Sequence, residues 1–379
     1  MKIGVDLHVV DGMFQGSRTH VIEIFSRVAA LCPEYEFFGL LDHVEGFKKD
    51  YPAFNLPNFK LVHMPHSGPI KRLMWQLPKL QRQLNLDLLH TQYIVPLPSL
   101  SRTMVTIHDV LFESHPEYFT AMFRLRSRIF MRLAAYQASH VFTVSNYSKH
   151  EICQRYGLAS DEVSVIYNGA DFNRFYPGGD GLEFIEKRGL ESGKYFITVG
   201  RLEPRKNHVT LLRAYSKLGK EAPRLVIVGQ KDFGFEALFE EIADPKLRER
   251  VLVVEDASDK ELPALYRHGL AFIYPSLAEG FGMPPLEAMA SGVPVIVANN
   301  TALTEVVGDA GLLVGSKDVE SLRKAMLDVV SDAELRNKLV AAGLKQAETF
   351  KWDVSAQIVA DRYRIFAKEK ISFKSISII

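Results

Sequence analysis

Residues 275–294 read Pro275-Ser276-Leu277-Ala278-Glu279-Gly280-Phe281-Gly282-Met283-Pro284-Pro285-Leu286-Glu287-Ala288-Met289-Ala290-Ser291-Gly292-Val293-Pro294 and are the most informative part of this chain. The preceding Ala271-Phe272-Ile273-Tyr274 is typical of a buried strand. Gly280 and Gly282 predict a loop whose backbone can approach a ligand closely. A proline pair then opens a short helix that a glycine and a further proline end. Glu279 would therefore lie in the loop and Glu287 on the helix, where both carboxylates can face one ligand.

The chemistry of this block suits a ligand that carries phosphates and hydroxyl groups. Amides at the start of a helix attract phosphate, and carboxylates accept hydrogen bonds from sugar hydroxyls. The plain alternative is a strand-loop-helix connection with two solvated glutamates. That alternative suits a lone glutamate better than it suits the whole block at this spacing.

The block resembles the signature of the retaining nucleotide-sugar glycosyltransferases of the GT-B fold, glycosyltransferase family 4. That signature is a pair of glutamates separated by seven residues and then a small Gly-x-Pro segment, here Ser291-Gly292-Val293-Pro294. The resemblance implies an α/β chain of two Rossmann-like domains, whose parallel sheets face each other across a cleft. It also implies that Glu279 contacts the donor sugar and Glu287 the nucleotide ribose, and that Gly280, Phe281, Gly282 and Met283 belong to the donor site.

Length and composition restrict the class of protein. The chain has 379 residues, enough for two domains, and its net charge of +1 argues against a nucleic-acid binder that relies on bulk electrostatics. Its two cysteines, Cys32 and Cys153, lie far apart in no metal-like spacing, which indicates reduced thiols and no structural metal. The sequence starts in a strand without a leader and has no apolar run long enough to span a bilayer, so we expect a cytoplasmic location.

Short apolar runs alternate with helical stretches, the pattern of parallel sheets covered on both faces. Two series of expected strands are visible, at 3–5, 36–41, 60–63, 87–90, 103–107, 140–144 and 163–167, then at 195–199, 224–228, 251–254, 270–274, 293–297 and 310–314. The segment 172–193, rich in glycine, proline and charge, is expected to connect the two domains. We therefore predict an acceptor-side domain at 1–175, a donor domain at 190–354, and a final helix at about 355–379 that returns to the first domain.

A second block, Gly200-Arg201-Leu202-Glu203-Pro204-Arg205-Lys206-Asn207, follows an expected strand. Ligands of open parallel sheets collect at the carboxyl ends of strands, and an arginine and a lysine there suit a diphosphate. A solvated turn is the plain alternative. The resemblance places Gly200, Arg201 and Lys206 on the donor diphosphate, where the two cations would neutralise the departing nucleotide. No Asp-x-Asp occurs, so a metal-independent reaction is expected.

Three further positions follow expected strands of the first domain. The loop 11–20 carries Gln15-Gly16 where family members carry a glycine pair, so the resemblance carries over Gly16 alone as a donor contact. His108, before Asp109, is implied to contact the donor sugar. The block around it, ending Pro116-Glu117-Tyr118-Phe119, looks most like bacterial mannosyltransferases that act on surface polysaccharides. Asn168-Gly169 is equally typical of a structural turn and of a binding turn.

Residues 122–132 place four arginines among large apolar side chains. They predict either a helix on an anionic inner membrane surface or a core-facing helix with arginines extended into water. The tail 368–379 is expected to be disordered, with a weak membrane contact as the alternative.

The sequence thus predicts a retaining hexosyltransferase without a cofactor, acting on a glycan or lipid-linked sugar in surface polysaccharide or lipopolysaccharide synthesis. Its expected donor is GDP-mannose, with UDP-glucose or another donor as the alternative. Rival hypotheses are a hydrolase or epimerase on the same scaffold and a non-catalytic two-lobed binding protein. The expected catalytic residues are His108, Arg201, Lys206 and Glu279.

Overall fold

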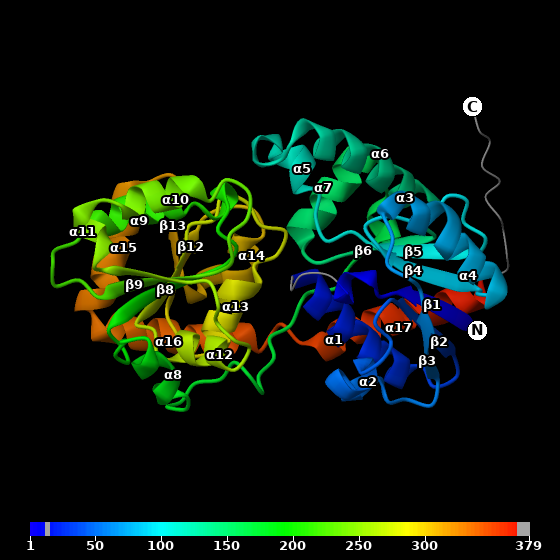
Figure 1. The fold of residues 1–379 in the computed structure, drawn as a ribbon, viewed down its shortest axis with the longest axis horizontal. Helices are drawn as coiled ribbons and strands as arrows, with labels where there is room; N and C mark the ends of the chain where they lie inside the picture. The colour runs from blue at the N-terminus through cyan, green and yellow to red at the C-terminus, as the bar shows by residue number, and fades with distance from the viewer. Residues whose placement is uncertain (12–15, 370–379) are drawn as a thin grey trace.

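The computed structural model describes residues 1–11 and 16–369 and shows two α/β lobes, each built around its own parallel sheet (Figure 1). We call the lobe with the seven-stranded sheet the first lobe and the lobe with the six-stranded sheet the second lobe. The GT-B architecture predicted from the sequence is confirmed.

The sheet of the first lobe has the order β3-β2-β1-β4-β5-β6-β7. Its strands are β1 (Lys2–Asp6), β2 (Glu36–Leu41), β3 (Phe59–His63), β4 (Leu88–Gln92), β5 (Arg102–Thr106), β6 (His140–Thr143) and β7 (Val163–Val165). The order reverses beside β1, which creates a crevice at the carboxyl ends of the central strands.

The sheet of the second lobe has the order β10-β9-β8-β11-β12-β13. Its strands are β8 (Tyr195–Val199), β9 (Arg224–Val228), β10 (Val251–Val254), β11 (Ala271–Tyr274), β12 (Val295–Ala298) and β13 (Leu312–Val314). Every strand predicted from the sequence is present. The last begins two residues later than predicted, because the residues Gly308–Ala310 form a short turn of helix.

Helices cover both sheets, which explains why the central strands are apolar on both faces. They are α1 (Gly16–Leu31), α2 (Phe47–Asp50), α3 (Pro69–Lys71), α4 (Leu77–Gln83), α5 (Leu111–Ser114), α6 (Ala121–Gln137), α7 (Asn146–Tyr156), α8 (Leu182–Lys187), α9 (His208–Ser216), α10 (Glu236–Ile242), α11 (Pro245–Arg248), α12 (Glu261–Arg267), α13 (Met283–Ala290), α14 (Leu303–Val307), α15 (Val319–Ser331), α16 (Ala333–Ala347) and α17 (Trp352–Lys368).

The segment 172–193, expected to be a connection, contains a helix of the second lobe. Helix α8 packs against α12, and Ile185 and Leu190 are buried with the core of that lobe. The two apolar side chains anchor the latter part of the segment, so the stretch that joins the lobes is shorter than the composition indicates.

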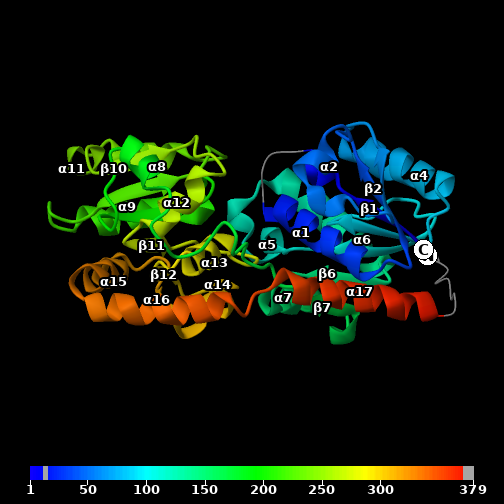
Figure 2. The same cartoon turned by 90° about the horizontal axis from the view of Figure 1, so that it is seen from below.

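Helix α16 lies along the second lobe, and α17, which follows it, lies along the first lobe (Figure 2). Helix α17 packs against α1, and its buried side chains Trp352, Val359 and Tyr363 join the core of the first lobe. The Tyr363 hydroxyl lies 2.6 Å from Nδ1 of the buried His90 on β4. The helix begins three residues before the position that the sequence suggested, and residues 370–379 of the expected tail lie outside the described part of the chain.

Candidate functional site

A cavity of about 810 Å³ lies between the two lobes and is lined by residues from both. The first lobe contributes Ser17, Thr19 and Asp109, and the second contributes the ends of β8, β9 and β11. Every site residue predicted from the sequence lines this cavity: Gly16, His108, Asn168, Gly200, Arg201, Lys206, Glu279, Gly280, Phe281, Gly282, Met283 and Glu287. The fold therefore brings together residues that lie up to 271 positions apart in the chain, from Gly16 to Glu287.

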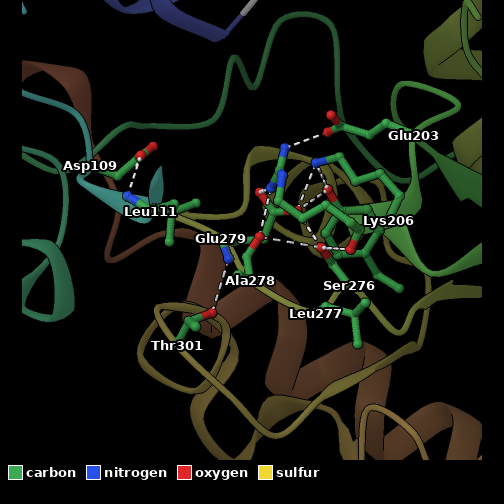
Figure 3. A network of polar contacts seen from close by, with 12 residues as sticks. Asp109, Leu111, Glu203, Lys206, Ser276, Leu277, Ala278, Glu279 and Thr301 are labelled. Carbon is green, nitrogen blue, oxygen red and sulfur yellow. Dashed lines mark hydrogen bonds and ion pairs between the residues drawn. The ribbon is translucent and has the colours of Figure 1, made fainter. Parts of the chain in front are cut away.

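Glu279 is buried at the centre of a polar network (Figure 3). Its Oε1 accepts hydrogen bonds from Lys206 Nζ at 2.7 Å, from the Tyr274 hydroxyl at 2.8 Å and from the Ser276 hydroxyl at 2.6 Å. Its Oε2 lies 3.0 Å from Nη1 of Arg205. Both carboxylate oxygens therefore have cationic partners, and the side chain has little freedom to reorient.

The charge state of Glu279 follows from these partners. Burial by itself would raise the pKa of the carboxyl group, but the charges of Arg205 and Lys206 outweigh it and lower the pKa to about 2. The carboxylate is therefore ionised at any physiological pH. A cavity that carries a fixed carboxylate beside cationic groups can bind both hydroxyl groups and phosphates.

Lys206 ends the short helical turn Pro204–Lys206 and is almost fully buried. The turn exists because Pro204 fixes its first residue and Asn207 adopts a left-handed conformation with φ 59°. Asn207 is held there by hydrogen bonds from its amide to the carbonyl oxygens of Pro275 and Ser316, at 2.9 and 2.6 Å. Burial, followed by the nearby charge of Arg205, lowers the pKa of Lys206, while Glu279 opposes that shift.

Arg205 is the functional candidate that the sequence analysis missed. Its Nη1 donates to the carbonyl oxygen of Ala278 at 2.6 Å, and its Nη2 donates to Oε1 of Glu203 at 2.5 Å. Although burial opposes the charged form, the carboxylates of Glu279 and Glu203 raise the pKa of Arg205. The guanidinium therefore links the loop before Glu279 to the turn that carries Lys206.

Arg201 lies at the wall of the cavity, apart from the network around Glu279. Its Nη1 lies 2.5 Å from Oδ2 of Asp232, and its side chain is about one-third exposed at the wall of the cavity. The guanidinium thus lines the cavity but takes no part in the hydrogen bonds around Glu279. Nothing in the sequence distinguishes Asp232 from the other aspartates of the chain, so its pairing with Arg201 could not be predicted.

Glu287 lies in the second turn of α13, which begins after Gly282. Gly282 has φ 114°, a conformation that favours glycine, and a proline follows Met283 in the first turn. The Tyr266 hydroxyl donates to Oε2 of Glu287 at 2.9 Å. Burial raises the pKa of Glu287 to about 7, with the hydrogen bond from Tyr266 opposing the shift. The two glutamates of the block therefore differ in their protonation. The carboxyl group of Glu279 is ionised at neutral pH, whereas the pKa of Glu287 lies near neutrality.

His108 lies at the carboxyl end of β5, with Nε2 at 3.0 Å from Oε1 of Gln92. Burial, and then the nearby His20, hold the pKa of His108 well below its ordinary value, so the ring is neutral. The ring also packs edge-on against His20 at 4.7 Å between centroids. His108 can therefore act as a neutral hydrogen-bonding group.

Asn168 and Gly169 combine the two interpretations that the sequence left open. Asn168 lines the cavity, and its Oδ1 lies 2.8 Å from Nδ1 of His20. A β-carbon on Gly169 would lie 2.7 Å from the backbone nitrogen of Trp352, so this glycine lets α17 start beside the turn. The turn is structural at the glycine and faces the cavity at the asparagine.

The lobes touch directly at the rim of the cavity. The hydroxyls of Ser145 and Ser148 donate to the carbonyl oxygen of Gly280 at 2.7 and 3.1 Å. Asp109 lies against the same residue: a β-carbon on Gly280 would be 2.7 Å from Cβ of Asp109. Figure 3 shows Asp109 approaching from the first lobe on the side opposite Lys206. Gly280 is therefore the point at which the two lobes meet beside Glu279.

Among residues 1–11 and 16–369, no three histidine, cysteine, aspartate or glutamate side chains are grouped so that they could hold a metal ion. No helix in this part of the chain has the length and apolar character needed to cross a bilayer.

Comparisons with known proteins agree with this geometry. The model for Glycosyltransferase Family 4 matches residues 14–174, and the model for Glycosyl transferases group 1 matches residues 182–346. O-antigen chain mannosyltransferase B of Escherichia coli is 31% identical over 276 residues, which cover 70% of this chain and 71% of that protein. O-antigen chain mannosyltransferase RfbU of Salmonella typhimurium is 32% identical over 240 residues, 63% of either chain.

A solved structure shows the same fold over nearly the whole length. Anabaena Alr3699/HepE in complex with UDP and glucose superimposes with a TM-score of 0.77 at 21% identity, covering 96% of this chain and 100% of that chain. With two lobes that match both family models in order and a bacterial relative matched over most of its length, the chain belongs to glycosyltransferase family 4 and is a glycosyltransferase of the GT-B fold.

Proposed function

We propose that this enzyme transfers mannose from GDP-mannose to a hydroxyl of a glycan or lipid-linked oligosaccharide, with retention at the anomeric carbon, in the synthesis of a bacterial surface polysaccharide. The observation that carries the proposal is the buried Glu279 held between Arg205 and Lys206 at the wall of an interlobe cavity. The names of the two mannosyltransferase relatives support the choice of sugar and of pathway.

The donor would lie along the second lobe. Its diphosphate would contact Arg201, Lys206, the loop at Gly16 and the backbone N–H of Met283 at the start of α13, because Pro284 and Pro285 have no N–H to donate. Its ribose hydroxyls would donate to Glu287. The base would lie near Gly229 and Gln230, which line the cavity after β9. In this pose the sugar lies between Glu279 of the second lobe and His108 of the first.

The reaction would follow a same-face path. The bond between the anomeric carbon and the phosphate oxygen breaks, the acceptor oxygen attacks from the same side, and the acceptor proton passes to an oxygen of the leaving diphosphate. Glu279 suits an orienting role more than a nucleophilic one, because both of its oxygens are already held by cations and hydroxyls. The protein then supplies mainly positioning and electrostatic stabilisation.

We also propose that the reaction needs no metal ion. Arg201 and Lys206 carry the positive charge that would stabilise the departing diphosphate, with Arg205 close behind them. This set of side chains can take over the electrostatic role that a divalent cation has in other phosphate-departing reactions.

The donor is tested by calorimetric titration with GDP, UDP and ADP. Tighter binding of GDP supports the mannose donor, and tighter binding of UDP would replace it with a UDP-sugar while leaving the transferase intact. The reaction is tested by incubating the enzyme with the donor and an acceptor panel. A disaccharide product with a retained anomeric configuration supports the proposal.

The same assay separates the rival functions. Free sugar or a converted nucleotide sugar without transfer favours a hydrolase or epimerase, and binding without turnover on any acceptor favours a binding protein. Glu279→Gln is expected to lose transfer. The matched control is Glu240→Gln, which alters an exposed glutamate of α10 on the same lobe.

A further inference from the structure

Helix α6 exposes an unusual number of large apolar side chains. Met122, Leu125 and Ile129 are 77%, 60% and 50% exposed, and Leu133 and Tyr136 are also exposed. These five residues are spaced three or four positions apart, so they form one stripe along the helix. An exposed apolar stripe of this length is rare on a soluble surface unless it contacts something.

The opposite side of α6 is the one that packs on the protein. Its buried residues are Ser127, Met131, Ala134 and Ala135, three of them small, and the helix contacts α5, α7 and β5. The helix therefore turns its small side chains inward and its large apolar side chains outward, the reverse of an ordinary amphipathic surface helix. Figure 1 shows α6 along the upper edge of the first lobe, above α7 in that view.

Arginines flank the exposed stripe. Arg126, Arg128 and Arg132 are exposed, and residues 121–137 contain no aspartate or glutamate. Within the described part of the chain, Arg128 pairs with Glu113 at 3.3 Å, and no ion pair is recorded for Arg126 or Arg132. The guanidinium of Arg132 lies 5.9 Å from the centre of the Tyr136 ring. The stripe is thus an apolar surface with a positive border.

The positive charge of these arginines favours an anionic partner. A second copy of the helix would bring arginines against arginines, which like-charge repulsion disfavours. An anionic bilayer offers phosphates to the arginines and acyl chains to the apolar stripe, as for a helix lying in the plane of a membrane interface. We propose that the exposed face of α6 docks the enzyme on an anionic lipid bilayer.

The position of α6 relates this contact to the reaction. The helix begins twelve residues after Asp109, a residue that lines the interlobe cavity, and it packs against the intervening α5. A bilayer on this face would therefore lie on the first lobe, which the sequence predicts to be the acceptor-side domain. This part of the inference rests on the proposed lipid-linked acceptor, whereas the binding of lipid does not.

The experiment measures co-sedimentation of the full chain with vesicles of phosphatidylcholine alone and of phosphatidylcholine mixed equally with phosphatidylglycerol. The wild type is expected to bind the anionic vesicles, less so at high salt. The triple variant Met122→Ser, Leu125→Ser and Ile129→Ser is expected to lose more than about tenfold in binding. Arg126→Gln with Arg132→Gln is expected to lose the preference for anionic lipid.

The matched control alters another exposed apolar stripe. Val354, Ile358 and Ile365 of α17 are also exposed, and this helix carries Asp353 and Asp361. Val354→Ser with Ile358→Ser and Ile365→Ser is expected to bind vesicles like the wild type. Donor titration shows that each variant is folded, because the donor cavity involves none of the altered side chains.

Three results would overturn the docking proposal: equal vesicle binding by the α6 triple variant and the wild type, equal binding to both kinds of vesicle, or a concentration-dependent dimer that the triple variant abolishes. The proposed function fails separately. It fails if the wild type transfers sugar to no acceptor, soluble or vesicle-bound, and that outcome leaves the vesicle measurement unchanged.

Discussion

Nζ of Lys206 lies 2.7 Å from Oε1 of Glu279 and 2.6 Å from the hydroxyl of Tyr274. A buried ammonium and a buried carboxylate thus hold each other at the point where the proposed sugar and diphosphate meet. Removing either partner leaves the other charged and buried, which is costly inside a protein. The contact therefore ties activity to stability at this position.

Lys206→Ala is expected to lower both activity and stability, whereas Arg201→Ala is expected to lower activity with little change in stability. Each would remove a proposed charge-assisted contact to the departing diphosphate, worth roughly 2–4 kcal/mol of transition-state stabilisation. The difference arises because Lys206 is buried with Glu279 while Arg201 is partly exposed beside Asp232. Kinetic constants and thermal unfolding measure the two effects, and near-normal turnover of either variant would refute the phosphate role.

Arg205→Ala is expected to reduce kcat by more than about tenfold, because Oε2 of Glu279 loses its cation and the loop at Ala278 loses its hydrogen bond. Arg205→Lys should restore only part of the activity, since the single ammonium group of lysine cannot contact Ala278, Glu203 and Glu279 as the two Nη atoms of the guanidinium do. Arg213→Ala, on an exposed arginine paired with Glu241, is the matched control. Equal activity of the alanine and lysine variants at the wild-type level would contradict a positioning role.

Donor affinity is expected to rise with pH through about 7, because the pKa of Glu287 is about 7 and the ionised carboxylate is the better acceptor for ribose hydroxyls. Below that value the protonated form dominates, and affinity should fall by up to about tenfold per pH unit. Calorimetry with an intact nucleotide sugar between about pH 6 and about pH 8 measures the slope.

Glu287→Gln removes the titrating group and should flatten this profile. Glu279 supplies an internal reference, since its pKa of about 2 keeps it ionised across the whole window. A wild-type affinity that does not change with pH, or a slope that persists in the glutamine variant, would assign the ribose contact elsewhere.

Gly280→Ala is expected to weaken donor binding and lower kcat, because the added β-carbon would lie 2.7 Å from both Cβ and Oδ2 of Asp109. The neighbouring backbone has to shift, and Glu279 shifts with it. Gly219→Ala is the control, since nothing lies within 4 Å of its added β-carbon. Steady-state kinetics of both variants test the contact, and unchanged KM and kcat in Gly280→Ala would show that the lobes do not need this approach.

EDTA is expected to leave transfer largely intact, and added magnesium is expected to change the rate by less than about twofold. The reason is that Arg201 and Lys206 supply positive charge at the proposed diphosphate position. Complete inhibition that magnesium or manganese reverses would overturn the metal-independent mechanism.

The sequence predicted the sheets well, because each strand is a short apolar run bounded by turn residues. Phe196 and Ile197 in β8, for example, are fully buried between helices, and such burial on both faces leaves a clear compositional pattern. Glu279 and Glu287 were equally visible, because their spacing is a local property of a strand, a loop and a helix.

The roles of the cations were less visible. In the run from Arg201 to Lys206, three basic residues lie within six positions, and the pattern does not say which of them faces Glu279. That choice depends on the left-handed conformation of Asn207 and on its contacts to Pro275 and Ser316, residues 68 and 109 positions away. Arg205 was therefore missed, and the approach of Asp109 to Gly280 was missed for the same reason.

The return of α17 to the first lobe limits how this enzyme can be divided. A gene fragment that stops within the connection after residue 175 would encode the seven-stranded sheet without Trp352, Val359 and Tyr363, leaving their apolar partners on α1 and β4 in water. The first lobe is thus a discontinuous unit. A chimera that exchanges lobes between relatives to change donor or acceptor has to transfer residues 1–175 and α17 from the same parent.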